Sequence, residues 1–281
     1  MVRRWSIPLA TIAIAFGTML GMAGNASAAT THMTAARPGV TAVHSFTPGG
    51  LMARPTGVGP ARAIGRGGRA TAESTNWSGY AATGSNGAFT SVSGSWTQPT
   101  ATCSSSGRGR NSDQYAAFWV GLDGFSSDSV EQTGSDSDCA GRTPDYYGWY
   151  EMYPAAPVNF NNPVRPGDSM SASVTFSGTE TFTLVLKDNT EGWTQTITKN
   201  ETGLARSSAE IITEAPSSNT GVLPLADFGT INYSASTANG TSLASHSPTE
   251  IIMIDNSGQD KDSTGAINSS GGFSNTWLRA N

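Results

Sequence analysis

Glutamate side chains on predicted strands are the residues best placed to do chemistry in this chain. Glu151 shares one face of an aromatic-rich segment with Tyr147, Trp149 and Tyr153, because side chains alternate along a strand. A carboxylate on an apolar face costs free energy unless polar partners surround it, which favours a functional cleft. An ion-paired surface position is the alternative interpretation of Glu151 that the residues leave open.

A second pair of carboxylates lies further along the chain. Glu210 and Glu214 flank Ile212 on one face of a short apolar segment, as a period of two requires. Two carboxylates on one face indicate a functional face, although an exposed sheet edge would look similar. Gln132 is an amide in a Gln-Thr-Gly sequence, and physical reasoning alone does not select it from other glutamines.

The common alternatives to carboxylate chemistry lack their residues. A Ser-His-Asp or Cys-His site needs a histidine base, and the chain has three histidines. His32 and His44 lie in a segment that we expect to be removed, and His246 lies in a Ser- and Pro-containing loop typical of a surface. There is no H-E-x-x-H motif, histidine cluster or phosphate-binding glycine loop. We therefore expect no metal in the site and no cofactor, although the Asp- and Asn-rich loops leave a structural calcium ion open.

The N-terminus predicts export. Arg3 and Arg4 precede an apolar run over residues 7–22, and small residues follow at 26–28. This order of basic, apolar and small residues is typical of a signal peptide, here residues 1–28. A short N-terminal anchor is the alternative. We expect a secreted protein.

Residues 29–70 differ in composition from the rest of the chain. They are rich in Gly, Pro, Ala and Thr, contain five arginines and have no acidic residue. Such a segment cannot bury enough apolar surface to fold alone. We interpret it as a disordered basic pro-segment that inhibits the protein until removal, with a plain linker as the alternative.

The charge of the remaining chain is strongly negative. Residues 71–281 hold all 21 acidic residues but only nine basic ones, a formal charge of −12. This charge argues against nucleic acid or an anionic membrane as a partner. It is compatible with work in acid, where carboxylates are protonated, and equally with simple solubility.

Residues 71–281 are long enough for one domain, and they have the pattern of an all-β protein. Apolar and Ser/Thr side chains alternate over 169–176 and again over 181–186, which predicts half-buried strands. Further strands are expected at 89–96, 115–120, 146–153, 193–198, 208–214, 228–233, 250–254 and 273–278. Many short strands without a convincing long helix predict an antiparallel sandwich or barrel. Cys103 and Cys139, the only cysteines of an exported chain, should form one disulfide.

Several short blocks together resemble one known family. The blocks are Asn76-Trp77-Ser78-Gly79, the Trp-Val-Gly-Leu-Asp-Gly run at 119–124, Gln132-Thr133-Gly134, the Trp-Tyr-Glu-Met-Tyr-Pro run at 149–154, and the Ala-Glu-Ile-Ile-Thr-Glu run at 209–214. In this order they resemble the glutamic peptidases, or eqolisins, over residues 74–255, and we identify the chain as a secreted, bacterial-type member. The resemblance implies a sandwich of two large bent antiparallel sheets, of the concanavalin A-like or jelly-roll type.

The resemblance also implies a catalytic dyad of Gln132 and Glu214. Trp119, Asp123 and Glu151 would line or support that site, and we add Trp149 and Tyr153 as supporting residues. Two departures stand out: Glu131 replaces an apolar residue before the glutamine, and a less acidic, less aromatic tail follows Glu214. These departures leave substrate preference and optimal pH open.

The function that follows is a secreted acid endopeptidase acting on proteins and peptides. Glu214 would be the general base that activates water, and Gln132 would stabilise the oxyanion. We expect a monomer whose own pro-segment inhibits it. Two alternatives stay open from the residues alone: a β-sandwich glycoside hydrolase using Glu151 and Glu214, and a non-catalytic carbohydrate-binding module.

Overall fold

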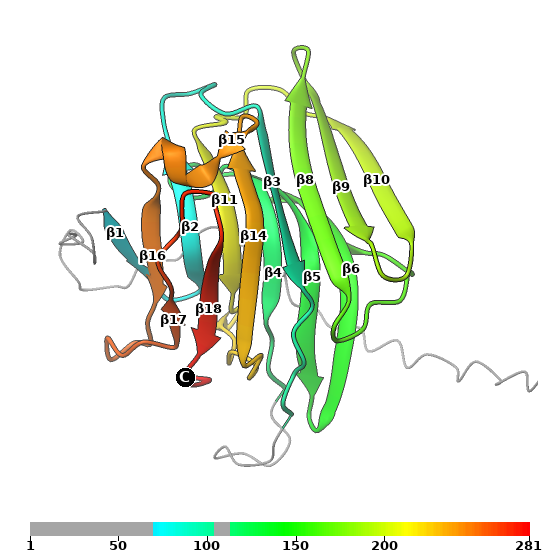
Figure 1. Ribbon diagram of the computed structural model, residues 1–281, viewed down its shortest axis with the longest axis vertical. Coiled ribbons are helices and arrows are strands. Elements are labelled where there is room, and N and C mark those ends of the chain that lie inside the picture. Colours follow the sequence, from blue (N-terminus) through cyan, green and yellow to red (C-terminus); the bar gives the residue numbers. More distant parts are fainter. Residues whose placement is uncertain (1–69, 104–112) are drawn as a thin grey trace, which may run out of the picture. The chain divides into compact units, whose positions relative to one another are not determined.

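The computed structural model describes residues 70–103 and 113–281, which form two large β-sheets packed face to face (Figure 1). The predicted signal peptide and pro-segment lie outside the described residues, except for Ala70. The prediction of an all-β sandwich of two large sheets is confirmed, because each of the two sheets has eight or seven strands in its main order. The described residues contain one short 3-10 turn, Leu243–His246, and no other helix.

The first sheet has the strand order β1-β16-β2-β11-β4-β5-β6-β7. Its strands are β1 (Thr71–Ser74), β16 (Thr249–Met253), β2 (Trp77–Thr83), β11 (Ser208–Glu214), β4 (Ala117–Leu122), β5 (Val130–Ala140), β6 (Thr143–Tyr153) and β7 (Val158–Asn159). All neighbouring pairs are antiparallel except β1 with β16, which run parallel. The antiparallel prediction therefore fails only at this edge.

The second sheet has the order β10-β9-β8-β3-β14-β18-β17, with β15 paired to β14. Its strands are β10 (Trp193–Asn200), β9 (Thr181–Asp188), β8 (Ser169–Ser177), β3 (Ser91–Thr97), β14 (Thr230–Ala238), β18 (Phe273–Trp277), β17 (Asp262–Thr264) and β15 (Thr241–Ser242). A separate hairpin of β12 (Ser217–Ser218) and β13 (Gly221–Val222) follows directly after β11. Every strand predicted from alternation overlaps one of these elements.

The core lies between the two sheets. On β8, Met170, Ala172 and Val174 are buried, as the alternation predicts, and β9 buries Leu184 and Leu186 in the same cluster. The first sheet contributes the inward residues of β2, β4 and β11, among them Tyr80, Phe118, Val120 and Ile211. Burying each large apolar side chain contributes about 1.5–3 kcal/mol, so this cluster is the main source of stability.

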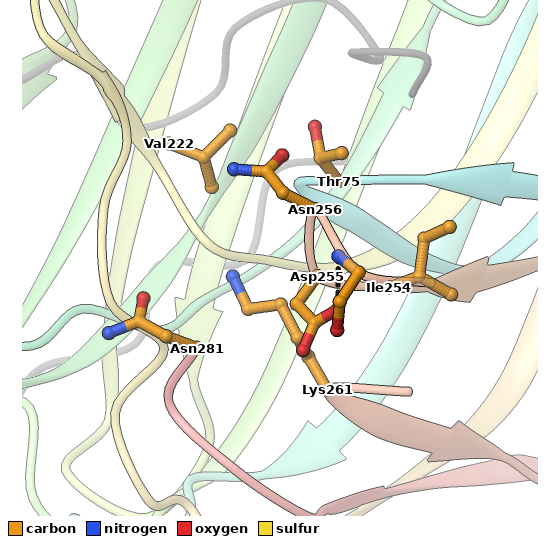
Figure 2. Close-up of a pocket in the computed structure, with 8 residues that line it drawn as sticks. Thr75, Val222, Ile254, Asp255, Asn256, Lys261 and Asn281 are labelled. Carbon is orange, nitrogen blue, oxygen red and sulfur yellow. Dashed lines mark hydrogen bonds between the residues drawn. The ribbon is translucent and has the colours of Figure 1, made fainter. Parts of the chain in front are cut away.

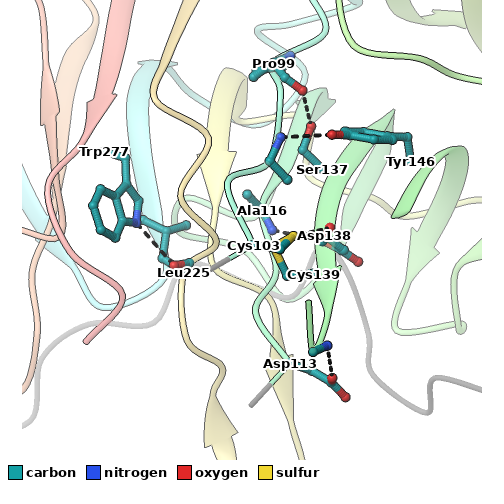
Figure 3. The surroundings of a disulfide bond; sticks show 12 residues. Pro99, Cys103, Asp113, Ala116, Ser137, Asp138, Cys139, Tyr146, Leu225 and Trp277 are labelled. Carbon is teal, nitrogen blue, oxygen red and sulfur yellow. Dashed lines mark hydrogen bonds between the residues drawn. A yellow bond between two sulfur atoms is a disulfide. The ribbon is translucent and has the colours of Figure 1, made fainter. Parts of the chain in front are cut away.

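The predicted disulfide joins Cys103 to Cys139 and is present in the structure (Figure 3). It links the segment after β3 to the end of β5. Hydrogen bonds beside it reinforce the same connection: Ser137 Oγ donates to Pro99 O, and Ala101 N donates to Tyr146 Oη. The disulfide thereby ties the second sheet to the strand that carries Gln132.

The outer face of the first sheet carries a second, smaller apolar cluster. It is built from alternate residues of the central strands, including Trp77, Trp119, Trp149 and Ile212, all fully buried. Side chains that point away from the sandwich core would ordinarily be solvated in an antiparallel sheet. This outer cluster is the environment in which the predicted site residues lie.

Candidate active site

Glu214 lies at the end of β11, where Trp77 of β2 and Ala117 of β4 are its neighbours across the sheet. The side chain points to the outer face and is fully buried. Trp119 Nε1 donates to Glu214 Oε2 at 2.8 Å, and Asn76 Nδ2 donates to Oε1 at 3.3 Å. Both oxygens of the carboxyl group therefore have nitrogen donors.

Gln132 lies on β5 directly opposite Glu151 of β6. Its amide Nε2 donates to Glu151 Oε2 at 2.7 Å, and both side chains are fully buried. The aromatic face predicted for Glu151 is thus a polar site rather than an ion-paired surface. The alternation of β6 places Trp149 and Tyr147 on the same face, as expected.

The register of the sheet does not place Gln132 directly in line with Glu214. Across β4, Gln132 pairs with Gly121, and Gly121 pairs with Glu210. Glu214 lies four residues further along β11, in line with Ala117. The dyad predicted by resemblance is therefore diagonal across β4, and some residue must connect its two halves.

Trp119 makes that connection. It lies on β4 between the two positions, and its indole N–H holds Glu214. Gly121 leaves room for the ring of Trp119. A Cβ at Gly121 would lie 2.8 Å from Trp119 Cζ3 and 3.2 Å from Gln132 Cβ. Gly121 therefore lies between the benzene edge of Trp119 and the side chain of Gln132, while the Trp119 nitrogen binds Glu214. Gly134 serves the same purpose, because a Cβ there would lie 2.6 Å from Trp119 Cβ.

The two glutamates titrate differently in this environment. Burial raises the pKa of Glu214 from its ordinary 4.5 to about 8, opposed by the donor Trp119. Burial, together with the charge of Glu214, raises the pKa of Glu151 from 4.5 to about 10. Glu214 therefore loses its proton first. Environments that push two carboxyl pKa values apart separate a base from a group that stays protonated.

A second pair of buried carboxyls, which sequence reasoning missed, adjoins the site. Tyr147 Oη lies 2.9 Å from Asp136 Oδ2 and 2.8 Å from Asp138 Oδ2, and Trp149 Nε1 donates to Asp136 Oδ1 at 2.5 Å. Burial raises the pKa of Asp136 to about 7. Period-two counting from Gln132 would have found both aspartates, had residues 130–140 been recognised as a strand.

The other predicted supporting residues have different surroundings. Asp123 directly follows β4 and accepts hydrogen bonds from the backbone of Arg206 at 2.6 Å and of Ser207 at 2.9 Å. These bonds anchor the turn that enters β11. Tyr153 is partly exposed and lies opposite Val130, at the edge of the outer cluster.

His246 is the histidine that lies within the described residues, since His32 and His44 lie outside them. His246 is partly exposed in the 3-10 turn, and its Nε2 lies 2.9 Å from Thr241 Oγ1. Within residues 70–103 and 113–281 no group of three or more His, Cys, Asp or Glu side chains is arranged to hold a metal ion. In the same part of the chain, no helix has the length and apolar character needed to cross a membrane.

Comparisons with known proteins agree with this geometry. The model of the Peptidase A4 family matches residues 75–277. Aspergillopepsin-2 of Aspergillus niger is 29% identical over 204 residues, which cover 66% of this chain and 72% of that protein. Because the family model spans well over half of the chain, the earlier resemblance to glutamic peptidases is confirmed.

Solved structures show the same similarity. A crystal structure of scytalido-glutamic peptidase with a peptide-based transition-state analogue superposes with a TM-score of 0.60 at 26% identity, covering 73% of this chain and 98% of that one. The aspergilloglutamic peptidase of Aspergillus niger superposes with a TM-score of 0.52 at 25% identity, covering 59% of this chain and 99% of that one. These matches favour the peptidase interpretation over the glycoside hydrolase and the carbohydrate-binding module. The chain belongs to the Peptidase A4 family and is a protease that hydrolyses peptide bonds.

Proposed function

We propose that the protein is a secreted acid endopeptidase whose catalytic dyad is Gln132 and Glu214. The observation that carries this assignment is the hydrogen bond from the Trp119 indole nitrogen to Glu214, made from strand β4, whose Gly121 pairs with Gln132. Strand β4 thus lies between the amide of Gln132 on β5 and the carboxyl group of Glu214 on β11. Peptide hydrolysis needs these two functions: a base for water and a donor for the oxyanion.

In the proposed reaction, Glu214 acts first as a base and then as an acid. The Glu214 carboxylate takes a proton from a water molecule, and the water oxygen attacks the carbonyl carbon of the peptide bond. Gln132 donates an N–H to the oxygen that becomes negative. Protonated Glu214 then gives its proton to the leaving amine as the C–N bond breaks, which restores the carboxylate. No covalent intermediate is needed.

Glu151 positions the amide of Gln132. The Nε2 atom carries two hydrogens, so it can hold Glu151 and an oxyanion at the same time. The bond of 2.7 Å to Glu151 Oε2 fixes the rotation of the amide plane. Because its pKa is raised to about 10, Glu151 stays protonated while Glu214 ionises. It therefore does not compete with Glu214 as a base.

Acid activity depends on hydration of the site. Desolvation is the main cause of the raised pKa of Glu214, so the buried carboxyl is protonated in acid. Water that enters with a substrate reduces this desolvation and returns the pKa toward its ordinary 4.5. Glu214 then becomes partly ionised in mild acid, where a carboxylate base works best.

The N-terminal regions complete the proposal. The predicted signal peptide, together with the disulfide, is compatible with secretion, because disulfides persist in oxidising compartments. We assign residues 29–70, with their five arginines, as an inhibitor that binds the acidic domain at neutral pH and leaves as carboxylates protonate. A synthetic 29–70 peptide added in trans should inhibit the mature enzyme near neutrality. Absence of inhibition at both neutral and mildly acidic pH would remove the idea.

The activity itself is tested with one assay. The chain from residue 29 onward is expressed, acidified and mixed with a denatured protein. Internal cleavage fragments should appear in acid, and Gln132→Ala should slow their formation by about 10²–10³. A preparation that is folded and digests nothing at any pH contradicts the proposed function.

A further inference from the structure

A pocket adjoins the proposed site at the end of the first sheet where Glu214 lies. Its volume is about 300 Å³, which is at the lower limit of typical ligand sites. Three loops and the last residue of the sequence line it: the turn before β2 with Thr75, the β12–β13 hairpin with Val222, the loop after β16 with Asn256, and Asn281 (Figure 2). We call this hollow the Lys261 pocket, after the one lysine in its wall.

Lys261 is the unusual feature of the pocket. Its side chain is only 3% exposed, yet Figure 2 shows its ammonium group directed into the space between Val222, Asn256 and Asn281. Lys261 takes part in neither of the two ion pairs found among the described residues. Lysine is almost never buried without a partner, so the group points to an absent anion.

The two side-chain carboxylates that attract Lys261, those of Asp255 and Asp262, have other hydrogen-bond partners. Asp262 accepts a hydrogen bond from Ser78 Oγ in the core. Asp255 Oδ1 accepts the backbone N–H groups of Ser257 at 2.7 Å and Gln259 at 3.0 Å, and Asp255 Oδ2 pairs with Arg279 at 3.7 Å. Their charges attract the ammonium group, but neither carboxylate forms an ion pair with it.

The ammonium group is charged under the proposed working conditions. Burial lowers the pKa of Lys261 to about 8, so it stays protonated throughout the acid range. Burial raises the pKa of the neighbouring Asp262 to about 7, so Asp262 is neutral in acid. The pocket is therefore most positive in acid, where the enzyme is proposed to work.

The turn 74–77 connects the pocket to the proposed site. On one side, Ile254 N, from the pocket wall, donates to Ser74 O at 2.8 Å. On the other side, Asn76 Nδ2 donates to Glu214 Oε1 at 3.3 Å, and Ala215 N donates to Asn76 O at 2.8 Å. Thr75 lies between these contacts and lines the pocket. A peptide bound at Glu214 thus has this pocket within a few residues of its scissile bond.

We propose that the Lys261 pocket is a specificity subsite that binds a carboxylate group of the peptide substrate, with Lys261 as the cation and the amides of Asn256 and Asn281 as further hydrogen-bond donors. This inference rests on the proposed function, because it assumes that the substrate backbone lies at Glu214. The carboxylate comes from an Asp or Glu side chain or from the C-terminus of a short peptide. A charge-assisted hydrogen bond is stronger than a neutral one, so recognition should be measurable.

The test uses a set of fluorogenic peptides assayed with the mature enzyme at mildly acidic pH. In one arm a single Glu is moved through the positions on both sides of the scissile bond, each peptide paired with its Gln counterpart. In the other arm a free C-terminus is compared with its amide. We expect at least one position, or the free terminus, to raise kcat/KM about tenfold over its neutral counterpart.

Variants of the pocket residues test whether Lys261 causes this preference for a carboxylate. Lys261→Met should remove the preference, and Lys261→Arg should retain part of it. Lys187→Met, at an exposed lysine on β9, is the matched control and should leave the preference intact. Asn256→Asp, at an exposed position of the pocket, adds a negative charge that repels a carboxylate and keeps the size of the side chain. It should lower the preference, and it provides a test even if Lys261→Met fails to fold.

The outcomes separate this inference from the proposed function. Cleavage of neutral peptides without any preference for a carboxylate overturns the subsite and leaves the peptidase assignment standing. A preference that survives both Lys261→Met and Asn256→Asp also overturns it. Failure to cleave any peptide contradicts the proposed function instead.

Discussion

The two faces of the first sheet use the same strands for different purposes. On β11, Ile211 and Thr213 point into the sandwich, where Ile211 joins the main core and Thr213 lies 2.9 Å from Tyr233 Oη. The alternate residues Glu210 and Glu214 point outward and are equally buried. Inward burial stabilises the fold, whereas outward burial raises carboxyl pKa values. Alternation along β11 therefore separates the residues that stabilise the core from those proposed to do chemistry.

The largest difference between the faces should appear in two glutamines. Gln132→Ala, on the outer face, should lower kcat by about 10²–10³, the usual cost of losing one oxyanion donor. Gln98 is the control, because its amide bridges the sheets by donating to Asp136 O at 2.9 Å and Ser137 Oγ at 2.8 Å. Gln98→Ala should lower the melting temperature and change kcat little. Equal losses of kcat in Gln132→Ala and Gln98→Ala would contradict the assignment of catalysis to the outer face and of stability to the contacts between the sheets.

The next effect concerns two adjacent isoleucines. Ile211→Ala removes a side chain from the main core and should cost about 2–5 kcal/mol of unfolding free energy. Ile212→Ala acts on the smaller outer cluster, beside Trp119, and should cost less stability but reduce kcat more. Urea denaturation and steady-state kinetics measure both. The comparison fails if Ile211→Ala alters kcat more than Ile212→Ala does.

The pH dependence of stability should be set by buried carboxyls. Burial raises the pKa of Glu131 and Glu214 to about 8 and of Asp136 to about 7. A raised folded-state pKa means that the folded protein binds more protons than the unfolded chain between pH about 4 and 8. Stability is then complete below that range and falls as the pH rises through it, so the melting temperature should decline steadily.

Glu131→Gln sharpens this prediction. The variant is neutral at every pH and nearly isosteric, so it should match the parent near pH 4 and melt at a higher temperature near pH 8. Calorimetry across this range is the measurement. A melting temperature of the parent that rises from pH 4 to pH 8 would falsify the account of buried, protonated carboxyls.

The smallest expected effect is a shift of the pH–rate profile in Trp119→Phe. Loss of the indole donor, which lowers the pKa of Glu214, should raise that pKa. The acid limb of kcat, which reports ionisation of the base in the hydrated substrate complex, should therefore move to higher pH by less than about one unit. An unchanged acid limb, or a shift to lower pH, would show that the Trp119 donor does not lower the pKa of Glu214.

Much of the fold could be predicted because strands such as β8 and β9 alternate regularly between polar and apolar residues. Strand β8 alternates Ser or Thr with apolar residues and was located to within a residue. Strand β5 was missed, because Gln, Gly, Ser and Asp dominate it and all but its last residue are buried. Its polar residues have partners within the fold, such as Trp149 for Asp136, which no local pattern could reveal. Strand β2 was missed for a similar reason, since Gly79 interrupts its apolar pattern.

The site was only half predictable from physics. Alternation selected Glu151 and the pair Glu210 and Glu214 without distinguishing the members of the pair, and the structure gives Glu151 and Glu214 polar side-chain partners. Gln132 came from family resemblance, because an isolated amide has no sequence signal. The network of Asp136 and Asp138 depends on pairing across the sheet, and a sequence does not specify that register.

The most direct test of the central claim compares two glutamates on one face of one strand. Glu214 binds Trp119, whereas Glu210 lies in line with Gln132 across β4. Both are fully buried, so Glu214→Gln and Glu210→Gln each replace a buried carboxyl group by a nearly isosteric amide. Cleavage of a denatured protein in acid should be lost in Glu214→Gln, by about a thousandfold or more, and largely retained in Glu210→Gln. Retained cleavage in Glu214→Gln with loss in Glu210→Gln would show that the base has been assigned to the wrong residue.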